Sequence, residues 1–496
     1  MSDQSRYRHI LKNTSIFGGV QVMQILTAIV KGKIVAILLG PTGMGLNSIF
    51  NSVINMIAEF ANFGLNYSAV RTLAQATETE DKNRLGHVLY VFNKWIIGCA
   101  IIGALILIIA APIISSISFN NKNYTYSFMW LSLAVIAIIF HKSRLAILQG
   151  TRQLNKLAKA SLCGSLVGVI IVIPIYLMYG ISGILPAIII SAIATWSISW
   201  FISRKTNTTI QLPLRQVFQE GRGMASLGIF MMISNMMSLA STYLLNAFIT
   251  ITGSLADVGL YQGAASITNQ SVGMIFTAMS VDLLPRLAAV CHNNNQVREI
   301  VNQQAEINIL CVTAIFGAMI LFAPLVIYIV LSQEFTTIIP VIRWMLLGML
   351  LRAAAYPVGT ISFSKGDKKT FLLYEAIITT SINFLGSAIG YAIYNLEGLS
   401  IGFVCSNFLY LILITQVTKR KYQFSFNRSF IQLYIKLFAI AISIFLCTIF
   451  LTSPWIYVCG SLLYIYSLYI IYQELNKRIQ LQELWSNLKN KYKKRH

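Results

Sequence analysis

About fourteen long apolar stretches constrain this chain more than any other feature of its sequence. Each has about 20 residues or more, enough for a helix to cross the roughly 30 Å hydrocarbon core of a bilayer. Lipid offers no hydrogen-bond partners, so a crossing segment must satisfy its backbone internally, as a helix does. Only 11% of the residues are charged, whereas soluble proteins carry about 25%. We therefore expect an all-α polytopic membrane protein with about fourteen transmembrane helices.

The distribution of basic residues predicts the orientation of these helices. The net charge is +22, and alternate connections collect the Lys and Arg residues, as at 204–222, 365–369 and 419–428. The opposite connections hold almost none, with Lys122 as the exception. Basic connections stay in the cytoplasm, so both termini are expected there. The basic tail then contacts water or lipid headgroups, and we expect no nucleic-acid partner.

The second half of the chain repeats the pattern of the first. Gly45 recurs as Gly259, and the segment that starts at Arg71 recurs from Arg286, an offset of about 214 to 218 residues. A repeat of six helices has an even number of crossings, so its two copies must run parallel and form two lobes around a central cavity. The predicted parts are an N-lobe of helices 1–6 at 1–209, a C-lobe of helices 7–12 at 210–420, and helices 13–14 with a basic cytoplasmic tail at 421–496.

A polar stripe runs along the second apolar stretch, residues 45–64. On a helix its members fall within an arc of about 80°; they are Ser48, Asn51, Asn55, Glu59 and Asn62. A carboxylate exposed to lipid costs about 2.5–3.5 kcal/mol, so this face must contact protein or a wet cavity. The second half repeats the stripe with Gln262 and Asn269. We expect both stripes to line the cavity.

Two lysines lie within the first apolar stretch. Lys31 shares a helix face with Gln24, and this face is expected to line the cavity. Lys33 lies about 200° away from Lys31 on a helix. It can extend its ammonium to the headgroups, and the alternative is that both lysines do so.

Two arginines lie within the apolar stretch 337–362. Arg352 is deep in the stretch and shares a face with Tyr356. Arg343 is nine residues away, about 180° around a helix, so the two cannot line one cavity. We expect Arg352 to face the cavity, whereas Arg343 is a weaker candidate that can equally anchor the helix at the membrane interface.

The sequence lacks the signatures of several enzymes. Its five histidines are scattered, and its seven cysteines form no CxxC pair, so neither a metal site nor a disulfide framework is expected. The segment GPTGMG at 40–45 is followed by Leu46 and Asn47, where a phosphate-binding loop needs Lys and Ser or Thr. The short outer connections leave little room for an extramembrane active site. We therefore expect no cofactor and no enzymatic activity.

The segment from Lys12 to Ala74, KNTSIFGGVQVMQILTAIVKGKIVAILLGPTGMGLNSIFNSVINMIAEFANFGLNYSAVRTLA, resembles the first two helices of a known family. These are the bacterial O-antigen and enterobacterial-common-antigen flippases, in the polysaccharide-transporter branch of the multidrug/oligosaccharidyl-lipid/polysaccharide exporter superfamily. The resemblance implies a flippase in the bacterial inner membrane, surrounded by membrane lipids. Such a protein moves an undecaprenyl-pyrophosphate-linked oligosaccharide from the cytoplasmic to the periplasmic leaflet by alternating access, without ATP.

The residues above fit that chemistry. Lys31 and Arg352 are candidates for binding the pyrophosphate, because a buried anion needs cations. The candidates for binding sugar hydroxyls are Gln24, Asn51, Asn55, Gln262 and Asn269. Glu59 is a hypothetical switch coupled to H⁺ or Na⁺, or alternatively an intramolecular partner for Lys31. Lys33 and Arg343 are lesser candidates.

Other functions stay open at this point. One is a cation-coupled multidrug exporter of the same superfamily, although the inferred positive cavity disfavours organic cations. A second is a membrane polysaccharide polymerase, which the short outer connections disfavour. A third is a scaffold that binds other polysaccharide-assembly proteins, with stripes that serve only helix packing.

Overall fold

The computed structural model describes residues 3–78, 82–204 and 213–479, and this part of the chain is helical without strands. It contains 11 stretches long and apolar enough to cross a membrane. Three of them are broken once, at Gly40, at 180–183 and at 394–395, so the 11 stretches hold about fourteen helical segments. The expected all-α polytopic architecture is confirmed. The basic tail at 480–496 lies outside the described residues.

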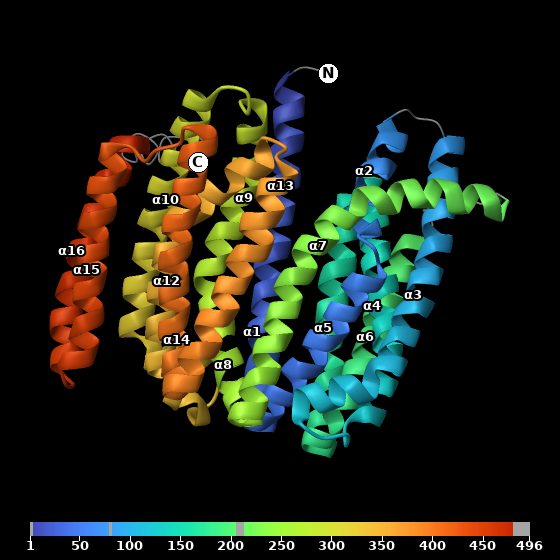
Figure 1. Cartoon of the computed structure of the whole chain (residues 1–496), viewed down its shortest axis with the longest axis horizontal. Helices are drawn as coiled ribbons and strands as arrows, with labels where there is room; N and C mark the ends of the chain where they lie inside the picture. The colour runs from blue at the N-terminus through green and yellow to red at the C-terminus, as the bar shows by residue number, and fades with distance from the viewer. Residues whose placement is uncertain (1–2, 79–81, 205–212, 480–496) are drawn as a thin grey trace, which may run out of the picture. The chain divides into compact units, whose positions relative to one another are not determined.

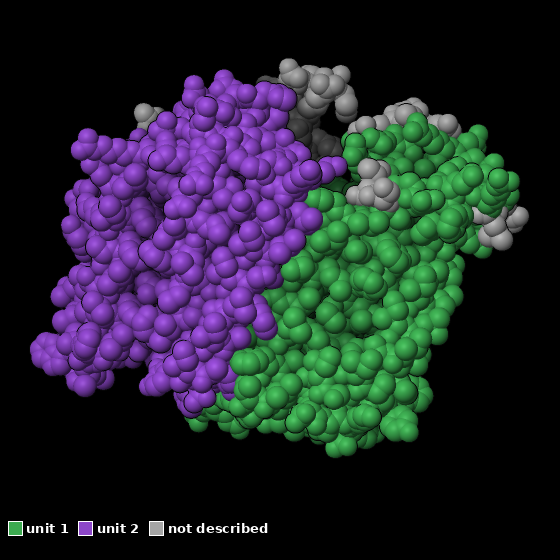
Figure 2. Space-filling view, in the orientation of Figure 1, with its two compact units in different colours: residues 1–263, 329–335 green, residues 264–328, 336–496 purple. Residues whose placement is uncertain are grey.

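The chain forms two compact units, coloured separately in Figure 2: residues 1–263 with 329–335, and residues 264–328 with 336–496. The first unit contains α1 (Asp3–Ala61), α2 (Leu65–Glu78), α3 (Lys82–Phe119), α4 (Thr125–Gly150), α5 (Leu154–Tyr179), η1 (Gly180–Gly183), α6 (Ile184–Ser203), α7 (Leu214–Thr252), most of α8 (Leu255–Thr268) and the first half of η4 (Gln333–Ile338). The predicted lobe boundaries at 209 and 420 stay predictions.

The second unit contains the remaining helices. They are η3 (Asn269–Gly273), α9 (Met274–Ala289), α10 (Asn294–Leu321), most of α11 (Ala323–Val330), α12 (Ile339–Ser364), α13 (Lys368–Thr370), η5 (Phe371–Ile378), α14 (Thr379–Tyr422), α15 (Arg428–Phe450) and α16 (Trp455–Ile479). Both η3 and η5 are π-helical, a form that is frequent at functional sites.

α1 is broken at Gly40, where the chain reverses its direction (Figure 1). Gly40 has φ 62° and ψ −170°, a backbone conformation that glycine adopts without the cost a side chain would add. Pro41 follows and has no N–H to donate to the preceding turn. The first and second apolar stretches of the sequence are therefore the two arms of α1, and both arms can contribute side chains to one site.

The second arm of α1 crosses α8 at a close backbone approach. A Cβ atom placed on Gly45 would overlap the carbonyl oxygen of Leu255, and one placed on Gly259 would overlap the carbonyl oxygen of Pro41. Gly45 and Gly259 are the two glycines related by the internal repeat. Only glycine permits helix axes to come this close, which explains why the same residue occupies both positions.

In the second unit, Asn302 ties α10 to the linker between α14 and α15. Its side chain is 2% exposed. Nδ2 donates to the Ser425 carbonyl at 3.2 Å, and Oδ1 accepts from the Asn427 amide at 2.8 Å. A helix side chain thus satisfies two backbone groups of this half-buried linker, which would otherwise depend on water for their hydrogen bonds.

Candidate functional site

A cavity of about 300 Å³ lies in the first unit, bounded by both arms of α1 and by α5 and α6. Its wall combines apolar side chains with polar ones that share the ability to bind anions or hydroxyls. Among the polar ones are Gln24, Lys31, Asn47, Asn51, Ser191 and Thr195. A few polar groups in a mostly apolar wall are typical of a ligand site.

Three residues predicted from sequence meet in this cavity: Gln24 and Lys31 from the first arm of α1, and Asn51 from the second. Asn51 Nδ2 donates to two atoms of Asn47: the carbonyl oxygen at 2.7 Å and the side-chain Oδ1 at 3.0 Å. Asn55 lies one turn further along, and its Nδ2 donates to the Asn51 carbonyl at 2.8 Å. These bonds fix both amide groups and leave their side-chain oxygens as acceptors.

Lys31 is the only charged residue among the described residues of the cavity wall. Its ammonium makes no hydrogen bond or ion pair with any residue that the structure describes. A partly buried cation with no partner among the described residues favours the binding of an anion, because no protein contact there offsets the cost of removing the ammonium from water. The cavity therefore suits a ligand that carries a phosphate or carboxylate.

Small residues on α5 keep the cavity open. The nearest atoms to a Cβ placed on Gly164 or Gly168 belong to Thr195 of α6, at 3.7 Å and 3.9 Å. α5 and α6 supply much of the cavity wall, although the polar residues singled out in the sequence lie on other helices.

Glu59 is buried at the far end of the stripe, 5% exposed. Its Oε2 lies 3.7 Å from Nζ of Lys142 on α4, and its Oε1 has no hydrogen bond within the described chain. One interpretation of the sequence was that Glu59 pairs with Lys31. In the structure its ion-pair partner is Lys142. Lys142 is one of several basic residues in the segment 141–156, so the sequence did not distinguish it from its neighbours.

Gln262 belongs to a buried polar network that joins α8, α7 and α1. Gln262 Nε2 donates to Asn246 Oδ1 at 2.9 Å. Asn246 is fully buried and in turn donates to Ser52 Oγ at 3.2 Å and to Ser48 Oγ at 3.4 Å. Asn246 lies outside the predicted stripes, and no spacing in the sequence pointed to it.

In the second unit, Arg352 of α12 lies near a carboxyl group. Tyr410 Oη donates to Glu375 at 2.8 Å, and the charge of Arg352 acts on both of these groups. A side chain at Gly359 would overlap the Glu375 carboxylate, so this glycine makes room for it. Glu375 is half-buried and hydrogen-bonded.

The other predicted residues lie elsewhere. Arg343 Nη1 donates to the Thr448 carbonyl at 3.3 Å and so connects α12 to α15. Lys33 Nζ donates to the Ile329 carbonyl at 2.8 Å, which places its ammonium on a protein acceptor. Asn269 is exposed in the π-helical η3. Neither Lys33 nor Arg343 lines the cavity of the first unit.

The chain is similar in sequence to known proteins. Residues 34–340 match the family model described as "Polysaccharide biosynthesis protein". The chain is 25% identical over 362 residues to the lipid III flippases of Escherichia coli (strain K12) and Shigella flexneri, which covers 71% of this chain and 85% of theirs.

Solved structures share the fold. The lipid II flippase MurJ in an inward closed conformation aligns with a TM-score of 0.69 at 12% identity, covering 94% of this chain and 99% of that one. An inward-facing multidrug resistance MATE family transporter of the MOP superfamily aligns with a TM-score of 0.66 at 18% identity, covering 81% and 94%.

Proposed function

This chain belongs to the polysaccharide biosynthesis protein family, and on that premise we propose that it is a flippase for a lipid-linked oligosaccharide. It would carry an undecaprenyl-pyrophosphate-linked glycan from the cytoplasmic to the periplasmic leaflet of a bacterial inner membrane, with both termini in the cytoplasm. The observation that carries the proposal is the cavity in the first unit, where the ammonium of Lys31 lies among amides and hydroxyls and has no partner among the described residues.

The cavity suits the polar end of such a lipid. A charge-assisted hydrogen bond from Lys31 to a phosphate oxygen contributes about 1.5–3 kcal/mol. Gln24 and Asn51 offer donors and acceptors for the hydroxyls of the adjoining sugar. The volume of about 300 Å³ is at the lower limit of ligand pockets, roughly 300–1,000 Å³. We therefore assign to this cavity the pyrophosphate and the first sugar, and not the whole glycan.

The remaining assignments complete the proposal. Arg352 and Asn269 would contact the substrate from the predicted C-lobe, with Gln262 and Asn55 as further sugar ligands. Glu59 would couple transport to H⁺ or Na⁺: neutralising its carboxylate weakens the ion pair with Lys142, and this change would favour one arrangement of the lobes over another.

A second candidate is a cation-coupled multidrug exporter, which the likeness to the MATE fold favours. Organic cations would bind best beside acidic groups. The charged group in the described wall of the cavity is the lysine, so we place this function second.

The test is transport of a fluorescent polyprenyl-pyrophosphate-linked oligosaccharide in proteoliposomes, together with deletion of the gene in its host. Lys31→Gln should lower the transport rate about 10- to 100-fold, the loss expected for one charge-assisted hydrogen bond. Lys33→Gln is the matched control, because Lys33 is two residues away and bonds to Ile329 instead.

Three outcomes decide the matter. Deletion should leave lipid-linked oligosaccharide on the inner leaflet and abolish the surface polymer, and the wild-type gene should restore it. Undiminished transport by Lys31→Gln at normal expression would contradict the role of Lys31. A wild-type protein that transports organic cations and no lipid-linked sugar would favour the exporter.

A further inference from the structure

The N-terminal part of α7, which begins at Leu214, lies across α3 before the helix bends away (Figure 1). Trp95 of α3 fixes it there. Its Nε1 donates to the Val217 carbonyl at 2.9 Å, and its ring stacks on Phe218 with 5.6 Å between centroids and 28° between planes. A side chain at Gly221 would overlap the indole. The position of this helical segment on α3 is therefore specified by three contacts, at Val217, Phe218 and Gly221, within about one and a half turns of helix.

A groove of about 900 Å³ lies between this segment, α3 and the turn after α1. Its floor is apolar and includes Phe63, Trp95, Cys99, Ile102 and Phe218. Much of this floor stays open to the surroundings: Phe218 is 62% exposed and Ile102 is 42% exposed. An open apolar surface of this kind on a membrane protein contacts lipid chains.

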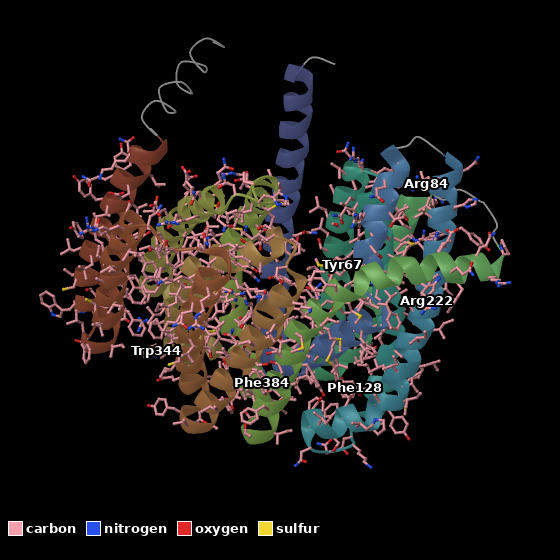
Figure 3. All side chains as sticks on the ribbon, turned by 45° about the horizontal axis from the view of Figure 1, so that its top comes forward. Tyr67, Arg84, Phe128, Arg222, Trp344 and Phe384 are labelled. Atoms are coloured by element: carbon pink, nitrogen blue, oxygen red, sulfur yellow. The ribbon has the colours of Figure 1, made fainter. Side chains whose placement is uncertain are left out.

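Three cations line the same groove: Lys94 from α3, and Arg215 and Arg222 from α7. Figure 3 labels Arg222 on the transverse part of α7. Both arginines are exposed, and neither makes a hydrogen bond or ion pair with another described residue. Lys94 lies over the Tyr90 ring at 5.6 Å. No acidic side chain is part of the groove as described, so its charge complements an anion.

We infer that this groove binds an anionic phospholipid of the cytoplasmic leaflet. Cations at the rim suit the phosphate, and each basic residue near a membrane surface attracts anionic lipid. The apolar floor suits an acyl chain, which would pass Gly98, where a Cβ has no neighbour within 4 Å. A free phosphate would use only the rim, whereas a lipid uses both parts. None of these residues lines the Lys31 cavity, so the site is separate from the proposed substrate site.

The test uses the quenching of Trp95 fluorescence by lipids with brominated chains. The full-length, delipidated protein is reconstituted with increasing mole fractions of brominated phosphatidylglycerol or brominated phosphatidylcholine. The Trp95 signal is the difference between the wild type and Trp95→Phe. We expect phosphatidylglycerol to quench at a mole fraction about fivefold lower than phosphatidylcholine does, because only the former carries net negative charge.

The double variant Arg215→Gln/Arg222→Gln should lose this preference. The matched control is Lys419→Gln/Arg420→Gln, which removes two exposed cations at the end of α14 and should keep it. Native mass spectrometry of lipid retained by the same two variants gives a second measurement that does not depend on Trp95. Equal quenching by both lipids in the wild type, or an unchanged preference without Arg215 and Arg222, would overturn the inference.

Discussion

Replacing Gly45 by Ala should separate α1 from α8. The added Cβ would overlap the Leu255 carbonyl oxygen and would lie 3.1 Å from the Gly259 amide nitrogen. Both obstacles are backbone atoms, which cannot rotate away as a side chain can. The helices must therefore move apart by about 1 Å, and overpacking of this kind costs about 1–3 kcal/mol.

Gly32 is the matched control for this substitution. It lies in the first arm of the same helix, and a Cβ placed there meets nothing within 4 Å. Ala is favoured over Gly in a helix by roughly 0.5–1 kcal/mol, so Gly32→Ala should stabilise the protein slightly. The two variants should then differ by about 1.5–4 kcal/mol in their free energy of unfolding.

The measurement is reversible unfolding in mixed detergent micelles, or the midpoint of thermal unfolding where refolding is incomplete. Gly259→Ala should behave as Gly45→Ala does, because its Cβ overlaps the Pro41 carbonyl at the same crossing. If Gly45→Ala is as stable as Gly32→Ala, the close approach of α1 and α8 does not contribute to stability and the reasoning is refuted.

Three further predictions concern polar contacts. Hydrogen bonds from Thr370, with smaller contributions from Tyr422 and Lys421, lower the pKa of Asp367 from 3.8 to about 2. The ionised carboxylate therefore stabilises the folded protein fully above pH 3.8, and this stabilisation is lost as the pH falls through about 2. Asp367→Asn should therefore unfold more readily than the wild type at neutral pH, and the difference should disappear below pH 2; a constant difference would contradict this. Lys142→Met leaves the Glu59 carboxylate buried without its ion-pair partner. It should lower the free energy of unfolding by about 1–2 kcal/mol, a value discounted for the partial exposure of the lysine. Adding Glu59→Gln to this variant should recover most of the loss, and no recovery would mean that the ion pair is not the cause. Asn302→Ala removes the acceptor of the half-buried Asn427 amide and should lower the free energy of unfolding by about 1–3 kcal/mol in denaturant. An unchanged free energy of unfolding would show that water replaces the side chain.

The sequence predicted the helices and the membrane-protein class correctly, because both depend on properties of short chain segments. A stretch such as 92–117 is apolar enough to leave water, and its backbone can be satisfied within the segment itself. The stripe on 45–64 likewise depends on a single helix, and Asn51 of that stripe lies in the wall of the cavity within the first unit. A central cavity between the lobes stays a prediction. Lys31 and Gln24 lie in the same cavity wall as Asn51 because the chain reverses its direction at Gly40, between the two arms of α1.

The hydrogen-bond and ion-pair partners that side chains find on other helices could not be predicted from the sequence. Periodicity assigns Glu59 to a face of α1, but α4 decides that Lys142 reaches it at 3.7 Å. Gln262 likewise lies on a predicted stripe, yet its amide bonds to Asn246 of α7, a residue that no spacing distinguishes. The sequence by itself determined which segments enter the membrane and which face of each is polar, because hydropathy and helix geometry act along one chain segment. Only the tertiary structure decided which polar groups are satisfied and which, like Lys31, stay available to a ligand, since hydrogen bonds and ion pairs form across helices at distances that packing sets.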